Sequence, residues 1–451
     1  MLRLAVPSIL ANITIPLVGI VDTAIAGHIS NAAAIGGIAI GTMLFDLLYW
    51  NFGFLRVGTA GMTAQAWGRR KADTAGGAAK GTPCEPVAIL AQSVSIALGG
   101  AVLILLLQWA FLTLALLLIP CSAEVAEFAR RYFFIRVWAA PATLTLMALK
   151  GWFIGMQDTV AAMITDLVVN CVNMLASWLL AVYTPLGAMG VAWGTLIAQF
   201  SGLIVAIVLC KRRISREMGS GEYARSSLRE ALQWRKIRKL FVLNVNLFVR
   251  SLCFMVVYVG FTSLAAKYGD TELAVSAIMM KLFMLFSYFI DGFAYAGEAL
   301  TGRFFGENNE EGVNLSVKIL FWWTVGIGAL CTLVYGLFGT GMIGLMTDKQ
   351  DVIAASGPYL IWLVLMPVVS CLAFMWDGIF VGATAGRQLR NCMIWSAIGF
   401  LVTYILLNRY IGIQALYLAY FVHLAVRALY LTVKWKAAKA AVLYPQAMKT
   451  A

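Results

Sequence analysis

The chain has 451 residues, of which 61% are hydrophobic and 12% are charged, and its mean hydropathy is +0.85. A soluble protein would carry about twice that charged fraction, so the composition excludes an ordinary soluble protein and indicates a polytopic membrane protein. The formal net charge is +13, which we interpret as a signal of membrane topology and of contact with anionic lipids, not with nucleic acid. The eight cysteines and two histidines form no CxxC pair or His/Cys cluster, so we expect no metal site and no cofactor.

The first apolar segment, residues 4–26, is long enough to cross a bilayer and carries Asp22 in the motif VDTAIAG. A carboxylate at membrane depth costs at least a few kcal/mol. It is therefore retained where it works in an internal cavity, or where a hydrogen bond pins helix packing. Pro7 and Pro16 lie upstream, and a proline inside a helix removes a backbone hydrogen bond and allows a bend. This pattern predicts a gating helix that bends at Pro7 or Pro16 and carries Asp22 as the ion-coupling group of a transporter.

Twelve apolar segments follow one another along the chain. They cover residues 4–26, 33–66, 87–119, 126–153, 160–183, 187–210, 240–265, 272–304, 312–337, 353–381, 391–407 and 413–433. The chain has no long alternating pattern typical of a β-barrel, so the spans must be helices. The expected fold is an all-α membrane protein with twelve transmembrane helices.

Lys and Arg gather after the second, sixth, tenth and twelfth segments, while the opposite loops contain few of them. Positive residues stay on the cytoplasmic side, so we expect a multi-pass protein of the cytoplasmic (inner) membrane with both termini in the cytoplasm. The longest basic run, residues 211–239, is predicted to be a cytoplasmic linker. It would join an N-terminal six-helix lobe, residues 1–210, to a C-terminal six-helix lobe, residues 240–451.

The two halves of the chain resemble each other in sequence. The matched positions are Thr63 with Thr301, residues 151–155 (GWFIG) with 378–382 (GIFVG), and Gly187 with Gly412. Six spans in each half mean that both halves enter the membrane from the same side. We therefore predict two six-helix bundles related by a parallel repeat, with a central cavity between the lobes.

Several motifs are similar to those of the MATE family of multidrug and toxin extrusion transporters. They are PSILANITIPLVGIVDTAIAGH, GMQDT, NCVN and GAMGVAWGTLIAQ, together with WDGIFVGATAGRQLRN, which resembles the DinF branch of that family. The resemblance covers nearly the whole chain in the same order. It implies a monomeric antiporter in the lipid bilayer that exports amphipathic, often cationic, small molecules in exchange for inward H⁺ or Na⁺.

The resemblance also implies an ion-coupling site in the first half. The acid of the first span is Asp22, an Asn on the fifth span aligns with Asn173, and a Thr on the sixth aligns with Thr195. Many members carry a second acid one turn after that Asn, but here the residue is Ser177. Sodium needs several oxygen ligands, so the loss of a carboxylate favours coupling to H⁺ over coupling to Na⁺.

The fifth span carries a polar stripe beyond this resemblance. Asp166, Asn170, Asn173 and Ser177 are spaced by 4, 3 and 4 residues, which places them on one helix face. A continuous polar stripe in a membrane helix must face protein or water. Asp166 is either an inner station on a proton path or an acid near the interface that only touches water.

The second half has its own polar line. On the eighth span these residues are Lys281, Tyr288, Asp291, Tyr295 and Glu298. Arg250 lies on the seventh span and Asp377 on the tenth, where the MATE resemblance places an acid in another branch. We take Lys281, Asp291, Asp377 and Arg250 as a candidate second polar site, which either couples an ion or forms neutralising pairs that lock helices together.

Three other functions remain to be weighed. A lipid-linked-sugar flippase or organic-anion exporter of the same superfamily would have a cavity rimmed by several Arg and Lys, whereas this chain balances acids with scattered bases. A passive channel would not need a titrating Asp22. An intramembrane enzyme would need a nucleophile–base pair or a metal cluster, and neither HExxH, GxSxG nor GxGD is present, so we expect no enzyme and no catalytic residues. Since no nucleotide-binding motif is found either, the energy source should be an ion gradient.

Overall fold

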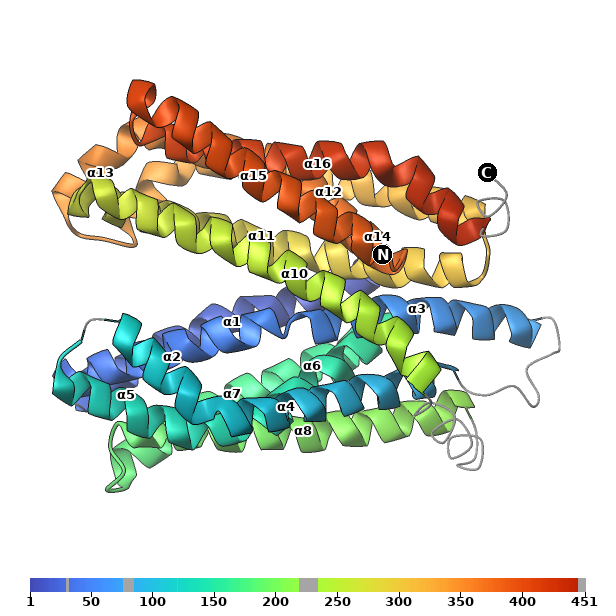
Figure 1. Ribbon diagram of the computed structural model, residues 1–451, viewed down its shortest axis with the longest axis horizontal. Helices are drawn as coiled ribbons and strands as arrows, with labels where there is room; N and C mark the ends of the chain where they lie inside the picture. The colour runs from blue at the N-terminus through green and yellow to red at the C-terminus, as the bar shows by residue number, and fades with distance from the viewer. Residues whose placement is uncertain (30–31, 76–84, 120, 219–233, 445–451) are drawn as a thin grey trace. The chain divides into compact units, whose positions relative to one another are not determined.

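The structure is a computed structural model that describes residues 1–29, 32–75, 85–119, 121–218 and 234–444. The side chains of residues 15–17, 20, 22–24, 26–29, 32–33, 218 and 234–236 lie outside that description. Every element in the described ranges is helical (Figure 1). In the first half these are α1 (Leu2–Ile29), α2 (Ala32–Asn51), α3 (Phe54–Ala75), α4 (Glu85–Leu118), α5 (Ala123–Arg136), α6 (Ala140–Gly155), α7 (Thr159–Tyr183) and α8 (Met189–Met218). In the second half they are α10 (Trp234–Ala265), α11 (Asp270–Gly306), α12 (Glu310–Gly344), α13 (Gln350–Ser356), α14 (Leu360–Gly382), α15 (Gly386–Ile411) and α16 (Gln414–Leu443).

The helices account for the expected spans. In the described ranges, eleven segments are long and apolar enough to cross a membrane, and α1 takes the place of the first expected span. Three of these segments consist of two consecutive helices: α2 with α3, α5 with α6, and α13 with α14. The all-α class predicted from the sequence is therefore confirmed, and the chain is a multi-pass membrane protein.

The chain divides into two compact units. The amino-terminal unit is Leu10–Val242, and the carboxy-terminal unit consists of Leu243–Ala451 together with Met1–Ile9. Helix α1 thus contributes its first turns to the carboxy-terminal unit, which the division into residues 1–210 and 240–451 did not foresee. The linker expected at residues 211–239 stays a prediction, because residues 219–233 lie outside the described part.

The internal repeat appears as the same helix contact in both units. In the amino-terminal unit α6 packs on α3, where a Cβ added to Gly155 would lie 2.6 Å from the Cβ of Thr63. In the carboxy-terminal unit α14 packs on α11, where a Cβ added to Gly382 would contact Thr301 and lie 2.8 Å from the carbonyl oxygen of Glu298. The sequence match of these glycines and threonines therefore reports an equivalent close packing, as a parallel repeat requires.

The turns repeat as well. Gly187, before α8, has φ 52°, and Gly412, before α16, has φ 55°. Gln157 and Thr384, each two residues beyond the second glycine of its motif, have φ 60° and 53°. Left-handed backbone at matched places shows that loop geometry, and not only helix order, is shared by the two halves.

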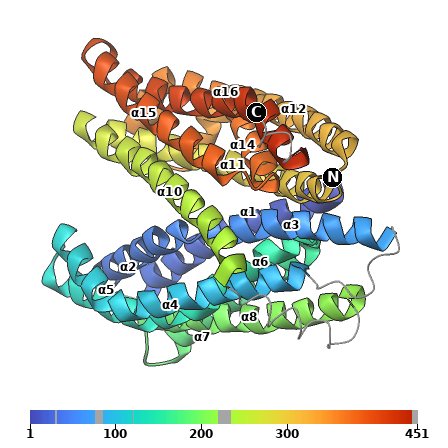
Figure 2. The ribbon, with the colours of Figure 1, turned by 45° about the vertical axis from the view of Figure 1, so that its right-hand side comes forward.

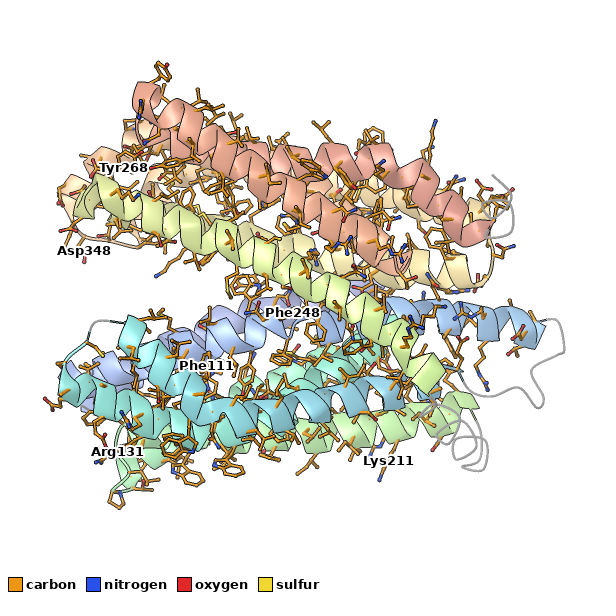
Figure 3. The ribbon with its side chains drawn as sticks, viewed as in Figure 1. Phe111, Arg131, Lys211, Phe248, Tyr268 and Asp348 are labelled. Carbon is orange, nitrogen blue, oxygen red and sulfur yellow. The ribbon has the colours of Figure 1, made fainter. Side chains whose placement is uncertain are left out.

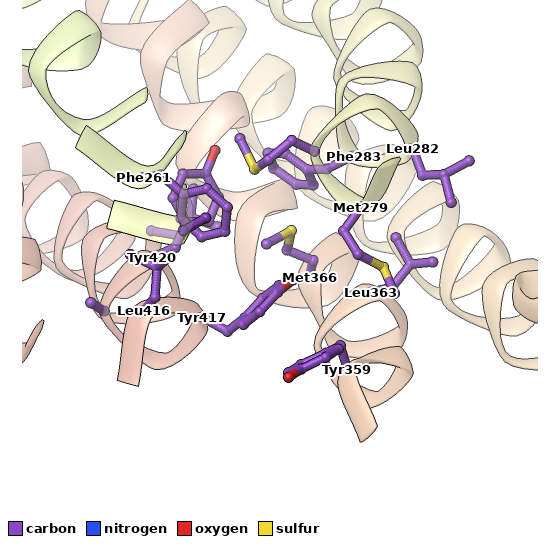
Figure 4. Packing of buried hydrophobic residues seen from close by; sticks show 14 of the residues in the cluster. Phe261, Met279, Leu282, Phe283, Tyr359, Leu363, Met366, Leu416, Tyr417 and Tyr420 are labelled. Carbon is purple, nitrogen blue, oxygen red and sulfur yellow. The ribbon is translucent and has the colours of Figure 1, made fainter. Parts of the chain in front are cut away.

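Each unit has its own apolar core. In the carboxy-terminal unit the core is rich in aromatic and methionine side chains, among them Phe261, Phe283 and Tyr420 (Figure 4). The rings of Tyr359 and Tyr417 stack with their centroids 5.1 Å apart. Large apolar side chains also cover the outer faces of the helices, as expected where lipid replaces water (Figure 3).

Polar and charged side chains mark the ends of the units. In the amino-terminal unit Arg131 and Lys211 lie at opposite ends, and in the carboxy-terminal unit Tyr268 and Asp348 lie at the same end (Figure 3). Both placements fit helices that cross the membrane alternately.

Candidate functional site

Helices α7 and α8 approach each other closely because α8 presents two glycines to α7 (Figure 2). Gly190 and Gly194 are four residues apart, the spacing that lets two membrane helices bring their backbones together. A Cβ added to Gly194 would lie 2.5 Å from the backbone nitrogen of Ser177, and one added to Gly190 would lie 2.6 Å from that of Ala181. The polar stripe of α7 is therefore pressed against α8 over at least one helical turn.

This contact brings two of the predicted ion-site residues together. The amide Nδ2 of Asn173 donates a hydrogen bond of 2.9 Å to the Thr195 hydroxyl, which in turn donates to the carbonyl oxygen of Val191 at 3.0 Å. Asn173, Thr195 and Ser177 are all buried, with 4%, 7% and 0% of their surface exposed. Oδ1 of Asn173 and Oγ of Ser177 have no hydrogen-bond partner among the described residues. The site thus holds two buried oxygen atoms that can still accept a hydrogen bond.

Helix α1 is joined to the same stripe. Asn170 donates a hydrogen bond of 2.5 Å to the hydroxyl of Thr14, which donates to the carbonyl oxygen of Ala11 at 2.7 Å. The first and fifth spans run in the same direction, and a helix rises about 1.5 Å per residue. Asp22 on α1 is therefore about 12 Å beyond Thr14, and Ser177 on α7 is about 10 Å beyond Asn170. The backbone of Asp22 accordingly lies near the depth of Ser177, although its side chain is outside the described residues, as is that of Pro16.

The amino-terminal end of the stripe on α7 is an ion pair. Asp166 on α7 contacts Nζ of Lys150 on α6, and the two side chains are 22% and 26% exposed. Lys150 directly precedes the GWFIG motif. Asp166 therefore contacts α6 and Asn170 contacts α1, while Asn173 and Ser177 both contact α8. The polar stripe of α7 thus faces protein.

The carboxy-terminal unit holds a second charged cluster. Asp377 on α14 accepts hydrogen bonds from Nη2 of Arg250 on α10, at 2.7 Å, and from Nη2 of Arg427 on α16, at 2.5 Å. Two of the four residues proposed for the second polar site, Asp377 and Arg250, are thus in contact. Lys281 is exposed on α11, and among the described residues the ion pairs of Asp377 are those with Arg250 and Arg427.

Arg427 is the functional candidate that the sequence reasoning missed. It is 1% exposed and lies in the middle of α16, with its guanidinium 5.4 Å from the centre of the Phe374 ring. The signal was available, because a charged residue inside an apolar span needs a partner. The sequence gives no direct means of matching it to Asp377, 50 residues earlier.

The first turns of α1 pack on α11 within the carboxy-terminal unit. A Cβ added to Gly292 would lie 2.9 Å from the carbonyl oxygen of Ala5 and would also meet Ile9. Pro7 lies between these two contacts and is half-buried in an unbroken helix. The predicted bend at Pro7 or Pro16 concerns a change of state and stays a prediction.

Comparisons with known proteins match most of the chain. The MatE family model matches residues 7–179 and 247–409. The chain is 34% identical to DNA damage-inducible protein F of Escherichia coli (strain K12), over 96% of this chain and 91% of that protein. It is 21% identical to the multidrug resistance protein MdtK of Edwardsiella ictaluri, over 86% of this chain and 82% of that protein.

Solved structures share the fold. One is a multidrug resistance MATE family transporter of the MOP superfamily in an outward-facing conformation, with a TM-score of 0.81 and 19% identity over 98% of this chain and 95% of that chain. Another is a MOP superfamily transporter from Pyrococcus furiosus, with a TM-score of 0.82 and 17% identity over 98% and 95% of the two chains.

Proposed function

Because the chain belongs to the MATE family, whose members are membrane transporters and not enzymes, we propose that it is a secondary active antiporter. It exports amphipathic, cationic small molecules in exchange for inward H⁺. The family membership carries the general part of this statement, a transporter for small molecules. The coupling ion is inferred from the polar stripe on α7, and the cationic substrate from the resemblance of the sequence motifs to the multidrug transporters of the family.

The observation that carries H⁺ coupling is the composition of the stripe on α7. Asn173 and Ser177 offer neutral oxygen atoms near the depth of Asp22, and no second carboxylate stands one turn after Asn173. Na⁺ would need several oxygen ligands with enough negative charge to replace its hydration shell, whereas a proton needs one carboxylate. Asp22 is therefore the proton carrier, and Asn173, Ser177 and Thr195 shape its surroundings.

The proposed cycle uses α1 as the moving element. Protonation removes the charge of Asp22 and so changes the cost of burying it among neutral groups. The helix then bends at Pro7 or Pro16, where proline removes a backbone hydrogen bond. Because α1 belongs to one compact unit up to Ile9 and to the other from Leu10, a bend in it acts on both units.

The protein is proposed to act as a monomer in the cytoplasmic membrane, with both termini in the cytoplasm. The support for the orientation is the distribution of Lys and Arg, which gather at one set of loops and at the end of α16. Lys434, Lys436 and Lys439 lie in that last stretch.

A second candidate function, export of an organic anion, is favoured by one observation. Two guanidinium groups, Arg250 and Arg427, face a single carboxylate, Asp377, in the carboxy-terminal unit. An excess of positive charge is typical of sites that receive acidic ligands.

The experiment is dye efflux from proteoliposomes that contain the purified protein. Ethidium extrusion is followed under a pH gradient and, separately, under a sodium gradient, for the wild type and for Asp22→Asn. We expect extrusion driven by the pH gradient that is lost in Asp22→Asn. The matched control is the double variant Lys150→Gln/Asp166→Asn, which also removes an intramembrane acid but keeps the net charge, and which should retain extrusion.

Two results would change the assignment. Extrusion driven by sodium that survives Asp22→Asn refutes the proposed proton site. Absence of ethidium transport under both gradients, together with extrusion of an anionic dye such as carboxyfluorescein, replaces the cationic substrate by an anionic one.

A further inference from the structure

The charged cluster of the carboxy-terminal unit is not electrically balanced. Asp377 is the one carboxylate in contact with Arg250 and Arg427 among the described residues. Both guanidinium groups stay protonated in any protein environment, so the three side chains together carry one positive charge. A buried charge without a counter-charge destabilises the folded protein, so a charge kept at such a place indicates a bound ligand or another function.

Arg427 is the more deeply buried of the two partners of Asp377. The Arg427 side chain is 2% exposed, compared with 20% for Arg250 and 12% for Asp377. Removal of a fully buried guanidinium from its carboxylate would leave both uncompensated. Asp377 can neutralise the charge of one guanidinium group and contacts two, of which Arg250 is the more exposed and therefore the one that a ligand could reach.

A third guanidinium extends the positive charge along α10. Nη1 of Arg390, on α15, donates to Oδ1 of Asn246 at 2.9 Å, and its other bonds go to the amide oxygen of Asn391. Arg390 therefore has neutral partners and no carboxylate among the described residues. Asn246 is one turn before Arg250 on α10, so the two cationic groups attach to neighbouring turns of one helix.

The cluster offers hydrogen-bond donors and an apolar wall. Nε of Arg250 and both Nε and Nη1 of Arg427 have no acceptor among the described residues. Phe374, half-buried beneath the Arg427 guanidinium, continues into the aromatic core through Phe283, with ring centroids 6.4 Å apart. Guanidinium groups beside aromatic rings are suited to binding a carboxylate or a small inorganic anion.

We propose that Arg250, with Arg427 and Asp377 behind it and Arg390 beside it, forms an anion-binding site in the carboxy-terminal unit. The ligand is either an inorganic anion such as chloride or the acidic group of an amphipathic organic molecule. In both cases it pairs with the accessible guanidinium of Arg250. The site does not depend on proton antiport, since it is defined by binding alone.

The test measures binding to the purified protein in a nonionic detergent, without transport. The unfolding temperature is followed at constant ionic strength while gluconate is replaced by chloride in one series and by benzoate in another. We expect at least one of the two anions to stabilise the wild type. Arg250→Gln should weaken the apparent affinity by about tenfold or more, because it removes a charged hydrogen-bond donor to the anion.

Three further variants make the result specific. Asp377→Asn should bind the anion more tightly than the wild type and depend on it more strongly for stability, since the anion then compensates two guanidinium groups. Arg250→Lys should retain weakened binding, and it replaces Arg250→Gln if that variant does not fold. Lys439→Gln is the control: its side chain is also 20% exposed and it pairs with Glu310 in the same unit, so its anion affinity should equal that of the wild type.

The outcomes separate the ligands and decide the proposal. Stabilisation by chloride alone assigns an inorganic anion, and stronger stabilisation by benzoate assigns an organic acid, provided that Arg250→Gln weakens it. No stabilisation of the wild type by either anion overturns the proposal. So does an equal affinity in the wild type, Arg250→Gln and Asp377→Asn.

Discussion

The contact of α7 with α8 can be broken by a single methyl group. In Gly194→Ala the new Cβ would lie 2.5 Å from the backbone nitrogen and 2.6 Å from the Cα of Ser177. Backbone atoms cannot swing aside, so α8 must move about 1 Å away from α7 to reach an ordinary separation of about 3.5 Å. The same movement stretches the 2.9 Å hydrogen bond between Asn173 and Thr195 beyond hydrogen-bonding distance.

The expected cost is about 2–4 kcal/mol in the free energy of unfolding. Overpacking contributes about 1–3 kcal/mol, and the lost interhelical hydrogen bond about 1 kcal/mol. Gly99→Ala on α4 is the matched control, because a Cβ there meets nothing within 4 Å, and it should stay within about 1 kcal/mol of the wild type. Unfolding of the two variants in mixed micelles with increasing SDS measures the difference. Equal stability of Gly194→Ala and Gly99→Ala would refute the packing argument.

Three other changes test separate contacts. Ser177→Ala should leave the unfolding temperature unchanged or raise it, because the buried hydroxyl of Ser177 has no described partner. Thr195→Val should lower the free energy of unfolding by about 1–3 kcal/mol, because the buried amide of Asn173 loses its acceptor. Thermal unfolding that ranks the two variants the other way contradicts the hydrogen-bond assignment. Lys150→Gln should destabilise the protein more than the double variant Lys150→Gln/Asp166→Asn does, because the single change leaves Asp166 without its partner. A double-mutant cycle should give a coupling energy of about 1–3 kcal/mol, and additive effects would mean that the pair does not interact. Trp435→Ala should lower the free energy of local unfolding at the end of α16 by about 2 kcal/mol, because the ring contacts with Phe305 and Trp376 are lost. Cleavage of that end by trypsin should become about thirtyfold faster. An unchanged rate would show that the aromatic contacts do not hold the end of α16 in place.

Much of the fold followed from the sequence because it depends on properties that local sequence carries. Hydrophobic runs located the spans, and the shared glycines of GWFIG and GIFVG located the contacts of α6 with α3 and of α14 with α11. Glycine is informative here since only a residue without a Cβ permits such close helices. The contact of Asn173 with Thr195 was anticipated from the family resemblance and not from spacing.

The pairing of charges could not be obtained in this way. Asp377 meets Arg250, 127 residues earlier, and Arg427, 50 residues later, and nothing local relates the three positions. The polar face of α11 shows the limit of spacing: it groups Lys281 and Asp291 on one helix face, but a helix face does not determine which neighbouring helices it meets. The spacing of the polar residues on α7 likewise predicted that they share one face, but it could not predict their partners on α1, α6 and α8.

The packing of Ala5 and Ile9 on Gly292 has a consequence for the order of synthesis. The beginning of α1 leaves the ribosome well before its partner on α11, which is made about 280 residues later. At about 5–20 residues per second, this interval is on the order of 15–60 s. During that time the amino-terminal unit can fold with the remainder of α1, while residues 1–9 have not yet met their partner on α11. Completion of the carboxy-terminal unit therefore requires an early part of the nascent chain to dock onto a much later one. A truncated product that stops before α11 would leave the first turns of α1 without this packing partner.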